Sequence, residues 1–286
     1  MMSTFTVNKF TNLIILKIMA RQLGHVNYGG TIGQIRHFKI KGLNGNFAGL
    51  KGGATAEQIK NDAAFVRTRE NMNEFGGCAH AARSVRVGLN SLMKQMSDAQ
   101  LTGRLTGIMK KINLEDQSEA RGVRAILIST QSKYLKGLHF NRNSNFERQF
   151  IAPFTLTDNG SRSSSTLSVG PFNPLNKVIA PAGATHFRLI NALSVVSDFI
   201  YNATTGVYEP VEPTLNEASS INYSEYIDMA VESSMPTNVY AELSNELTLT
   251  SNVTVLNSIG IEFYQRAGNN FYLLNTGNAL KIENVY

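Results

Sequence analysis

The sequence contains few of the residues that form disulfides in small proteins or stack against sugars. It has one cysteine, Cys78, and no tryptophan among 286 residues. A single cysteine excludes an internal disulfide framework and a cysteine-only metal site. With 42% hydrophobic and 17% charged residues, the chain can still bury a core large enough to fold without a disulfide or a metal.

Long apolar runs are also missing. No stretch of about 18 consecutive apolar residues occurs, so the sequence predicts no membrane-spanning helix. Residues 13–16 form a short apolar run that Lys17 interrupts, which is too short for the hydrophobic region of a signal peptide. We therefore expect a cytoplasmic protein, although export by a route that needs no N-terminal signal stays open.

The usual patterns of catalytic and metal-binding residues are absent as well. None of the five histidines belongs to a His-x-x-x-His or Glu-x-x-His pair. Cys78 and His80 form the only close cysteine–histidine pair, whereas zinc usually takes three or four such ligands. No serine lies in a Gly-x-Ser-x-Gly motif.

Carboxylates that a glycosidase would need in pairs do occur in the second half of the chain: Asp198, Glu225, Asp228 and Glu262. Any β-sandwich offers such pairs by chance, and no tryptophan is present to stack a sugar. The sequence thus predicts no catalytic residue, no cofactor and no metal site, and we expect a protein that is not an enzyme.

Glycines punctuate residues 28–50. Apolar and polar side chains alternate along residues 34–41, which predicts one strand of a hairpin. Residues 43–46 contain Asn-Gly and are predicted to form its turn, and residues 47–50 begin the returning strand. A phosphate-binding loop is the alternative reading, but neither a P-loop nor a dinucleotide-binding fingerprint occurs. We interpret these residues as turn glycines.

The stretch 61–77 joins this region to the helices that follow. It is predicted to be helical, and its charged and apolar residues are Arg67, Arg69, Glu70, Glu74, Phe65, Met72 and Phe75. We expect the helix to begin near Ala56, after a capping box at 55–58. It should end at Gly76 and Gly77, because glycine takes the positive φ of a helix C-cap.

Two further amphipathic helices are predicted from apolar residues spaced three, four and seven apart. The stripe of the first is Ala82, Val85, Leu89, Leu92, Met93 and Met96, and that of the second is Leu101, Leu105, Ile108 and Ile112. The second helix is expected to start from a capping box at 97–100 and to end in Lys110 and Lys111, whose charges complement the helix dipole. Short links predict an antiparallel helical packet.

From about Arg121 the apolar period changes from that of a helix to that of a strand. The predicted strands are residues 123–128, 135–140, 150–156, 166–169, 186–193, 197–202, 223–230, 240–249, 254–264, 271–275 and 279–282. Residues 203–206 and 266–270 are predicted to be hairpin loops. Many short strands separated in this way predict an antiparallel β-sandwich.

Together these patterns predict an α+β protein in three parts. Residues 1–18 are expected to be an N-terminal extension or β-arm. Residues 19–120 should hold the Gly-rich β-hairpin and the helical packet, and residues 121–286 the antiparallel β-sandwich domain. For residues 1–18 a docked or exchanged strand and an extension outside the compact fold stay open.

Several short motifs occur together along the chain: Met19-Ala-Arg-Gln22, Gly29-Gly-Thr-Ile-Gly33, Lys51-Gly-Gly53, Arg67-Thr-Arg-Glu-Asn71, Glu74-Phe-Gly76, Ala184-Thr-His-Phe-Arg-Leu-Ile190, Gly260-Ile-Glu-Phe-Tyr264, Phe271-Tyr-Leu-Leu274 and Gly277-Asn-Ala279. In this combination the chain resembles a family of uncharacterised bacterial proteins over residues 19–286. Members would start at Met19, so the resemblance implies that residues 1–18 are an extension. It implies no activity.

Charge is distributed unevenly. Residues 1–125 hold 18 Lys and Arg against 8 Asp and Glu, and residues 126–286 hold 9 against 13, so the halves carry +10 and −4. Such a split favours a polyanion partner or association of the basic half of one copy with the acidic half of another.

We therefore expect a structural, self-assembling protein that forms a homo-oligomer, as in a phage-like, secretion-related or filamentous particle. The alternative is a nucleic-acid-binding accessory protein, or one that binds another polyanion through its basic helices. The candidate contact residues are Arg67, Arg69, Arg83, Arg86, Lys94, Arg104, Lys110 and Lys111.

Overall fold

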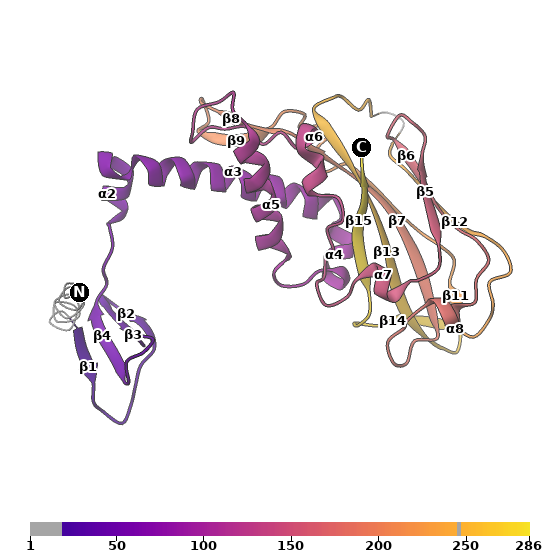
Figure 1. Cartoon of the computed structure of the whole chain (residues 1–286), viewed down its shortest axis with the longest axis horizontal. Coiled ribbons are helices and arrows are strands. Elements are labelled where there is room, and N and C mark those ends of the chain that lie inside the picture. The colour runs from indigo at the N-terminus through magenta and orange to yellow at the C-terminus, as the bar shows by residue number, and fades with distance from the viewer. Residues whose placement is uncertain (1–18, 245–246) are drawn as a thin grey trace, which may run out of the picture. The chain divides into compact units, whose positions relative to one another are not determined.

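The structure is a computed structural model that describes residues 19–244 and 247–286 (Figure 1). The chain divides into two compact units, of which one ends at Phe65 and the other runs from Val66 to Tyr286. We call them the N-terminal unit and the main unit. This division differs from the predicted boundary at 120/121, because the helices after Val66 pack on the large sheet. The predicted extension or β-arm, residues 1–18, lies outside the described residues.

The N-terminal unit contains a four-stranded antiparallel sheet of order β1-β4-β3-β2. Its strands are β1 (Met19–Gln22), β2 (Gly30–Ile32), β3 (Ile35–Phe38) and β4 (Asn46–Leu50), and two short helices follow, α2 (Ala56–Asn61) and η1 (Ala63–Phe65). The predicted hairpin is confirmed as β3 and β4, with Gly45 at φ 117° in its turn. The predicted capping box also forms, since Gln58 N donates to Thr55 Oγ1 and Thr55 N to Gln58 Oε1.

The main unit begins with three substantial helices, α3 (Val66–Gly88), α4 (Asn90–Met96) and α5 (Leu101–Glu115). Shorter helices are α6 (Ile128–Gln131), η2 (Ser132–Tyr134), α7 (Phe146–Gln149) and α8 (Pro174–Lys177). The predicted stripe from Ala82 to Met96 is divided between two helices, because Ala82 and Val85 lie on α3 and Leu92, Met93 and Met96 on α4. With the stripe of α5 these side chains join one hydrophobic cluster, in which Met93 and Ile108 are partly buried and the others are buried. The predicted capping box at 97–100 does not form, because Ser97 Oγ donates back to Met93 O instead.

The glycines of α3 act differently from the prediction. Gly76 and Gly77 do not end the helix, which continues to Gly88. A Cβ at Gly77 would come within 2.4 Å of the Tyr208 ring, and a Cβ at Gly88 within 2.1 Å of Ser194 Oγ. These two glycines therefore let the helix approach the strands closely, which is a requirement of packing and not of a C-cap.

Most of the predicted strands are present. The strands of the main unit are β5 (Phe154–Asp158), β6 (Ser164–Val169), β7 (His186–Ser197), β8 (Phe199–Asn202), β9 (Val207–Pro210), β10 (Ser219–Tyr223), β11 (Ile227–Asp228), β12 (Thr237–Glu242), β13 (Val253–Ala267), β14 (Asn270–Leu273) and β15 (Ala279–Val285). A six-stranded sheet has the order β10-β7-β13-β14, with β11 beside β7 and β15 beside β13. A three-stranded sheet has the order β12-β6-β5, and β8 pairs with β9.

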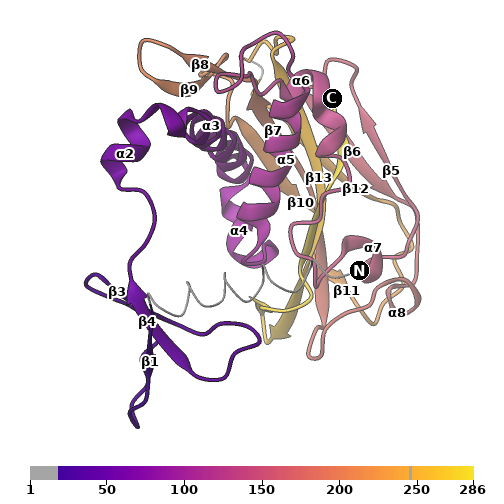
Figure 2. The same cartoon turned by 60° about the vertical axis from the view of Figure 1, so that its left-hand side comes forward.

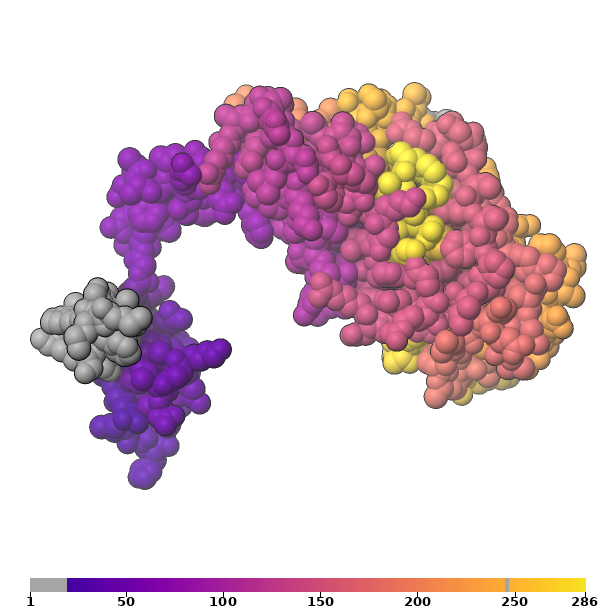
Figure 3. All heavy atoms as spheres, viewed as in Figure 1, coloured from indigo at the N-terminus to yellow at the C-terminus, as the bar shows by residue number. Residues whose placement is uncertain are grey.

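Two predicted strands are wrong. Residues 123–128 form one bridge, between Ile126 and Phe199, and residues 135–140 form one, between His139 and Lys281. The second segment runs along β15 without becoming a regular strand, since Gly137 N donates to Ile282 O and Phe140 N to Leu280 O. Figure 3 shows the C-terminal residues, in yellow, at the surface and framed by preceding parts of the main unit.

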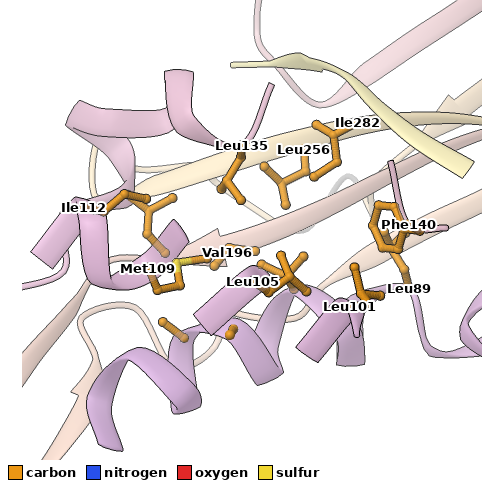
Figure 4. Close-up of a cluster of buried hydrophobic side chains, with 14 of the residues drawn as sticks. Leu89, Leu101, Leu105, Met109, Ile112, Leu135, Phe140, Val196, Leu256 and Ile282 are labelled. Carbon is orange, nitrogen blue, oxygen red and sulfur yellow. The ribbon is translucent and has the colours of Figure 1, made fainter. Parts of the chain in front are cut away.

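The six-stranded sheet is covered on both faces, so the main unit has three layers (Figure 2). On β7 the side chains of Ile190, Ala192 and Val196 face the helices, while Leu189 faces the three-stranded sheet. Figure 4 shows side chains of α5 meeting Val196, Leu256 and Ile282 of this sheet. The fold is α+β, as predicted.

One polar side chain fixes the two sheets against each other. Asn191 is fully buried, and its Nδ2 donates to the carbonyl oxygens of Ser165, at 3.0 Å, and Val239, at 2.9 Å. Its Oδ1 accepts from Asn257 Nδ2 at 2.7 Å. A sliding of either sheet would leave these buried groups without partners, so the bonds select one register.

Candidate functional site

The two faces of the N-terminal sheet differ. Ile32 lies opposite Ile35 in β2 and β3, and Ile35 lies opposite Leu50 in β3 and β4. Directly opposed residues point to the same face, so the three side chains form one row across three strands, which we call the apolar row. The other face carries Phe38 and Phe47, whose ring centroids are 6.4 Å apart.

The apolar row is exposed. Ile32, Ile35 and Leu50 retain 58%, 46% and 75% of their accessible surface. Four more large apolar residues of the same unit are exposed: Leu23, Val26, Tyr28 and Leu43. Among residues 20–65, Phe47 is the one buried hydrophobic side chain, at 5%. A small sheet normally needs a covered hydrophobic face to be stable by itself, and the described residues leave the apolar row of this sheet largely exposed.

The same sheet is basic. Its unit carries Arg21, Arg36, Lys39, Lys41 and Lys51, and residues 1–56 contain no Asp or Glu. The sheet and its loops therefore combine an exposed apolar row with basic side chains, and residues 1–56 contribute no acidic side chain.

Gln22 holds the loop between β1 and β2 in place. Its Oε1 accepts from Tyr28 N at 2.9 Å, and its Nε2 donates to Phe47 O at 3.2 Å. The same Nε2 lies 2.9 Å from His37 Nδ1. The Gln22 side chain thus ties the loop between β1 and β2 to strands β3 and β4 in the middle of the sheet.

The eight predicted basic contact residues have different roles in the structure. Arg67, Arg83, Lys94 and Lys111 are exposed. Arg69 and Arg86 are half-buried, and Arg83 and Arg86 together line a cavity of about 210 Å³ beside α4. The structure therefore brings only some of these side chains to solvent.

Arg104 and Lys110 form ion pairs within the main unit. Arg104 Nη2 lies 2.8 Å from Asp98 Oδ2 and also donates to the carbonyl oxygen of Phe140 at 2.9 Å. Lys110 pairs with Glu74. Both cations are already neutralised by partners, so they contribute less to phosphate binding than the sequence prediction assumed.

Glu74 is the centre of a buried ion cluster that joins α3, α5 and the segment after α5. Its side chain is 1% exposed and accepts from Arg124 Nε and Nη2, each at 2.8 Å, from Gly122 N at 2.8 Å, and from Lys110. Burial by itself raises the pKa of the carboxyl, but the hydrogen bonds from Arg124, Lys110 and Gly122 outweigh it and lower the pKa to about 2. Glu74, which lies in the stretch 61–77, thus ties α3 to α5 and to the segment after α5 within the main unit.

Other titratable groups are engaged locally. Cys78 is fully buried, and burial raises the pKa of its thiol to about 12, so the thiol stays protonated and unreactive at neutral pH. Asp198 accepts from Ser129 N and Oγ, and Glu262 from the Tyr264 hydroxyl. Within residues 19–244 and 247–286, no group of three or more His, Cys, Asp or Glu could hold a metal ion.

The apolar row was not predicted. It depends on the pairing of Ile32 with Ile35 across Gly33, which has φ 57°, and the sequence shows Gly33 as only one of several glycines. The strand character of residues 34–41 was the available signal, but it does not say which face has no cover.

Comparisons with known proteins add no relative. No family model, no curated protein and no solved structure matches this chain. The resemblance to a family of uncharacterised bacterial proteins therefore stays a hypothesis. In the part of the chain that the structure describes, no helix combines the length and apolarity needed to cross a membrane.

Proposed function

We propose that this protein is a non-enzymatic, self-assembling subunit in which the N-terminal sheet of one copy contacts another copy. The observation that carries the proposal is the exposed apolar row on a sheet in which Phe47 is the one buried hydrophobic side chain among residues 20–50. Contact between different surfaces of identical chains produces rings when it closes and filaments when it does not. The concrete version is a subunit of a phage-like, secretion-related or filamentous particle.

The size of the exposed surface supports this proposal. Full burial of a large aliphatic side chain contributes roughly 1.5–3 kcal/mol. Ile32, Ile35 and Leu50 are each about half to three-quarters exposed, so covering all three contributes roughly 3–5 kcal/mol. That amount is comparable to the roughly 3–5 kcal/mol that a single hydrophobic core supplies to a chain of fewer than about 70 residues.

The test is a set of full-length variants analysed by light scattering and negative-stain microscopy. Ile32→Ser, Ile35→Ser and Leu50→Ser combined should dissociate the assembly, because they remove the apolar contact and leave the main unit unchanged. Leu43→Ser is the control, since Leu43 is equally exposed but lies in the turn between β3 and β4, and it should assemble normally. Assembly of the triple variant at wild-type concentration would refute a role for the apolar row.

A deletion of residues 1–50 gives a second test of the same proposal. The shortened chain keeps the complete main unit from Val66 and should behave as a monomer with the circular dichroism expected of its sheets and helices. A deleted chain that still forms the full-length assembly would show that the contact lies elsewhere.

Nucleic-acid binding is the second candidate, supported by the exposed cations Arg67, Arg83, Lys94 and Lys111. If these contact phosphates, the logarithm of the binding constant should fall linearly with the logarithm of salt concentration, with a slope of about −0.9 per phosphate neutralised. Arg83→Gln with Lys94→Gln should reduce the slope, and Arg104→Gln should alter it little because Arg104 is paired with Asp98. Absence of retention on DNA or heparin at low salt would remove this candidate.

A further inference from the structure

We infer that the N-terminal sheet of one copy docks on residues 222–242 of a second copy, a segment of the main unit that contains no Lys and no Arg. We call this surface the acidic side. The inference rests on the proposed function and deepens it by naming the surface that receives the sheet. It places the contact at β11, β12 and the end of β10.

The first observation is that one segment of the chain lacks basic residues and another lacks acidic residues. Residues 189–265 contain no Lys and no Arg but ten Asp and Glu, while residues 1–56 contain seven Lys and Arg but no Asp and no Glu. Since 27 of the 286 residues are Lys or Arg, about seven would be expected in a stretch of 77 residues with average composition. Two segments of opposite charge are thus each free of the sign that would repel the other.

The second observation concerns which of the ten acids are available. Asp198 and Glu262 are buried, and Glu246 lies outside the described residues. Three others bond within the main unit: Glu209 to Asn202 and Thr205, Glu212 to Thr250 and Asn252, and Glu217 to Ser84. The remaining four, Glu225, Asp228, Glu232 and Glu242, all lie in the acidic side.

These four carboxylates can accept cations from another molecule. Glu225, Glu232 and Glu242 are exposed and form no ion pair within the described part of the chain. Asp228 accepts from Ala230 N, and its Oδ2 lies 3.8 Å from His186 Nε2. Exposed charge pairs contribute modestly one by one, so their main effect is to orient the incoming sheet.

The third observation is apolar surface on the same segment. Tyr226, Val231, Met235 and Tyr240 are large hydrophobic residues that remain exposed between the acids. Next to them is a cavity of about 540 Å³ lined in part by Asp228, Met229 and Ala230. Leu175 of α8 is 67% exposed and also lines it, as do His186 and Arg266. Arg188 also lies here, with its Cζ 4.5 Å from the Tyr223 ring centroid and 4.9 Å from that of Tyr226. The acidic side therefore offers the apolar row aliphatic and aromatic contacts among four carboxylates, with Arg188 and Arg266 beside them.

The position of the acidic side in the fold makes it reachable. β10 and β11 form one margin of the six-stranded sheet, and β12 forms a margin of the three-stranded sheet. The helices α3 and α5 pack on one face of the six-stranded sheet (Figure 1), and Tyr223 at the end of β10 contacts the same hydrophobic cluster. A second copy is the partner to which we commit, because the complementary segment occurs in this same chain.

The test uses charge reversal in the full-length protein, with the dissociation constant of the assembly as the readout at about 50 mM salt, where screening is weak. Glu225→Lys, Glu232→Lys and Glu242→Lys combined should weaken assembly by on the order of tenfold or more, since three attractive contacts become repulsive. Glu119→Lys is the control, because Glu119 is exposed on the main unit outside the acidic side. This substitution should change the dissociation constant of the assembly by less than about twofold, because most surface substitutions have small effects.

The decisive arm is rescue. The rescue variant adds Lys39→Glu, Lys41→Glu and Lys51→Glu to the chain that already carries the three Lys substitutions. It should recover at least half of the lost binding free energy, as measured by the dissociation constant of the assembly. Loss without rescue would refute the pairing of these two surfaces. The charge reversal could have no effect while the triple serine variant of the apolar row dissociates. In that case the acidic side is not the docking surface, and the proposed self-assembly through the apolar row is retained. If the wild-type protein is monomeric, the proposed function itself fails.

Discussion

Replacement of Glu74 by glutamine should destabilise the main unit by about 3–5 kcal/mol at pH 7, because it leaves the partly buried cations Arg124 and Lys110 without their buried carboxylate. The carboxyl is 1% exposed and pairs with Arg124 and Lys110. Its pKa is lowered from 4.5 to about 2, which corresponds to about 3 kcal/mol at about 1.36 kcal/mol per unit. The loss expected from unpairing the two cations and the free energy that corresponds to the lowered pKa of Glu74 are therefore similar.

The pH dependence of this effect has a defined sign. A carboxyl whose pKa is lower in the folded state stabilises the protein above its unfolded pKa and loses this contribution as the pH falls through the folded value. The contribution of Glu74 should therefore be complete above about pH 5 and decline between about pH 4.5 and pH 2. The stability difference between wild type and Glu74→Gln should shrink over the same interval.

The assay is urea unfolding followed by circular dichroism, at pH 7 and again near pH 3. Glu70→Gln is the matched control, because Glu70 lies one turn earlier in α3 and pairs with Arg121 at 3.3 Å with both side chains partly exposed. Such a pair contributes roughly 0–1 kcal/mol. Equal effects of the two substitutions, or a loss at Glu74 that does not depend on pH, would refute the assignment of a buried ion cluster.

Three further outcomes follow from packing and burial. Gly77→Ala and Gly88→Ala should each destabilise by about 1–3 kcal/mol, because a Cβ would clash with the opposing strands; Gly76→Ala, where a Cβ meets nothing within 4 Å, should be neutral or stabilising in thermal melts. Asn191→Leu should cost about 1–3 kcal/mol in urea unfolding, since it orphans buried groups in both sheets; a change under about 0.5 kcal/mol would contradict the register argument. The thiol of Cys78 should resist a thiol reagent at pH 8 until denaturant is added, and rapid labelling of the native protein would contradict its burial.

Local turn chemistry made much of the fold predictable. The loops at 203–206 and 266–270 were expected from their glycines and asparagines, and they join β8 to β9 and β13 to β14. The long strand β13 and the capping box at 55–58 were read from patterns that involve neighbouring residues only. These features depend on short-range geometry, which a single sequence contains.

Features that depend on distant partners could not be read in this way. Gly77 looks like a helix stop because the Tyr208 ring that requires it is far along the chain. Glu74 looks like a solvated helix residue, and nothing near it in sequence indicates Arg124. For the candidate contact surface, charge at positions such as Arg104 and Lys110 was visible, but their internal ion pairs were not. The apolar row required the strand register.

The most direct test of self-assembly is light scattering with negative-stain microscopy on the full-length protein at about 50 mM and about 500 mM salt, which shortens the screening length severalfold. We expect regular oligomers, rings or filaments at low salt, and smaller species at high salt as the contacts between basic and acidic segments weaken. A monodisperse monomer at both salt concentrations, at protein concentrations up to about 100 µM where contacts of about 5–6 kcal/mol become populated, would contradict it.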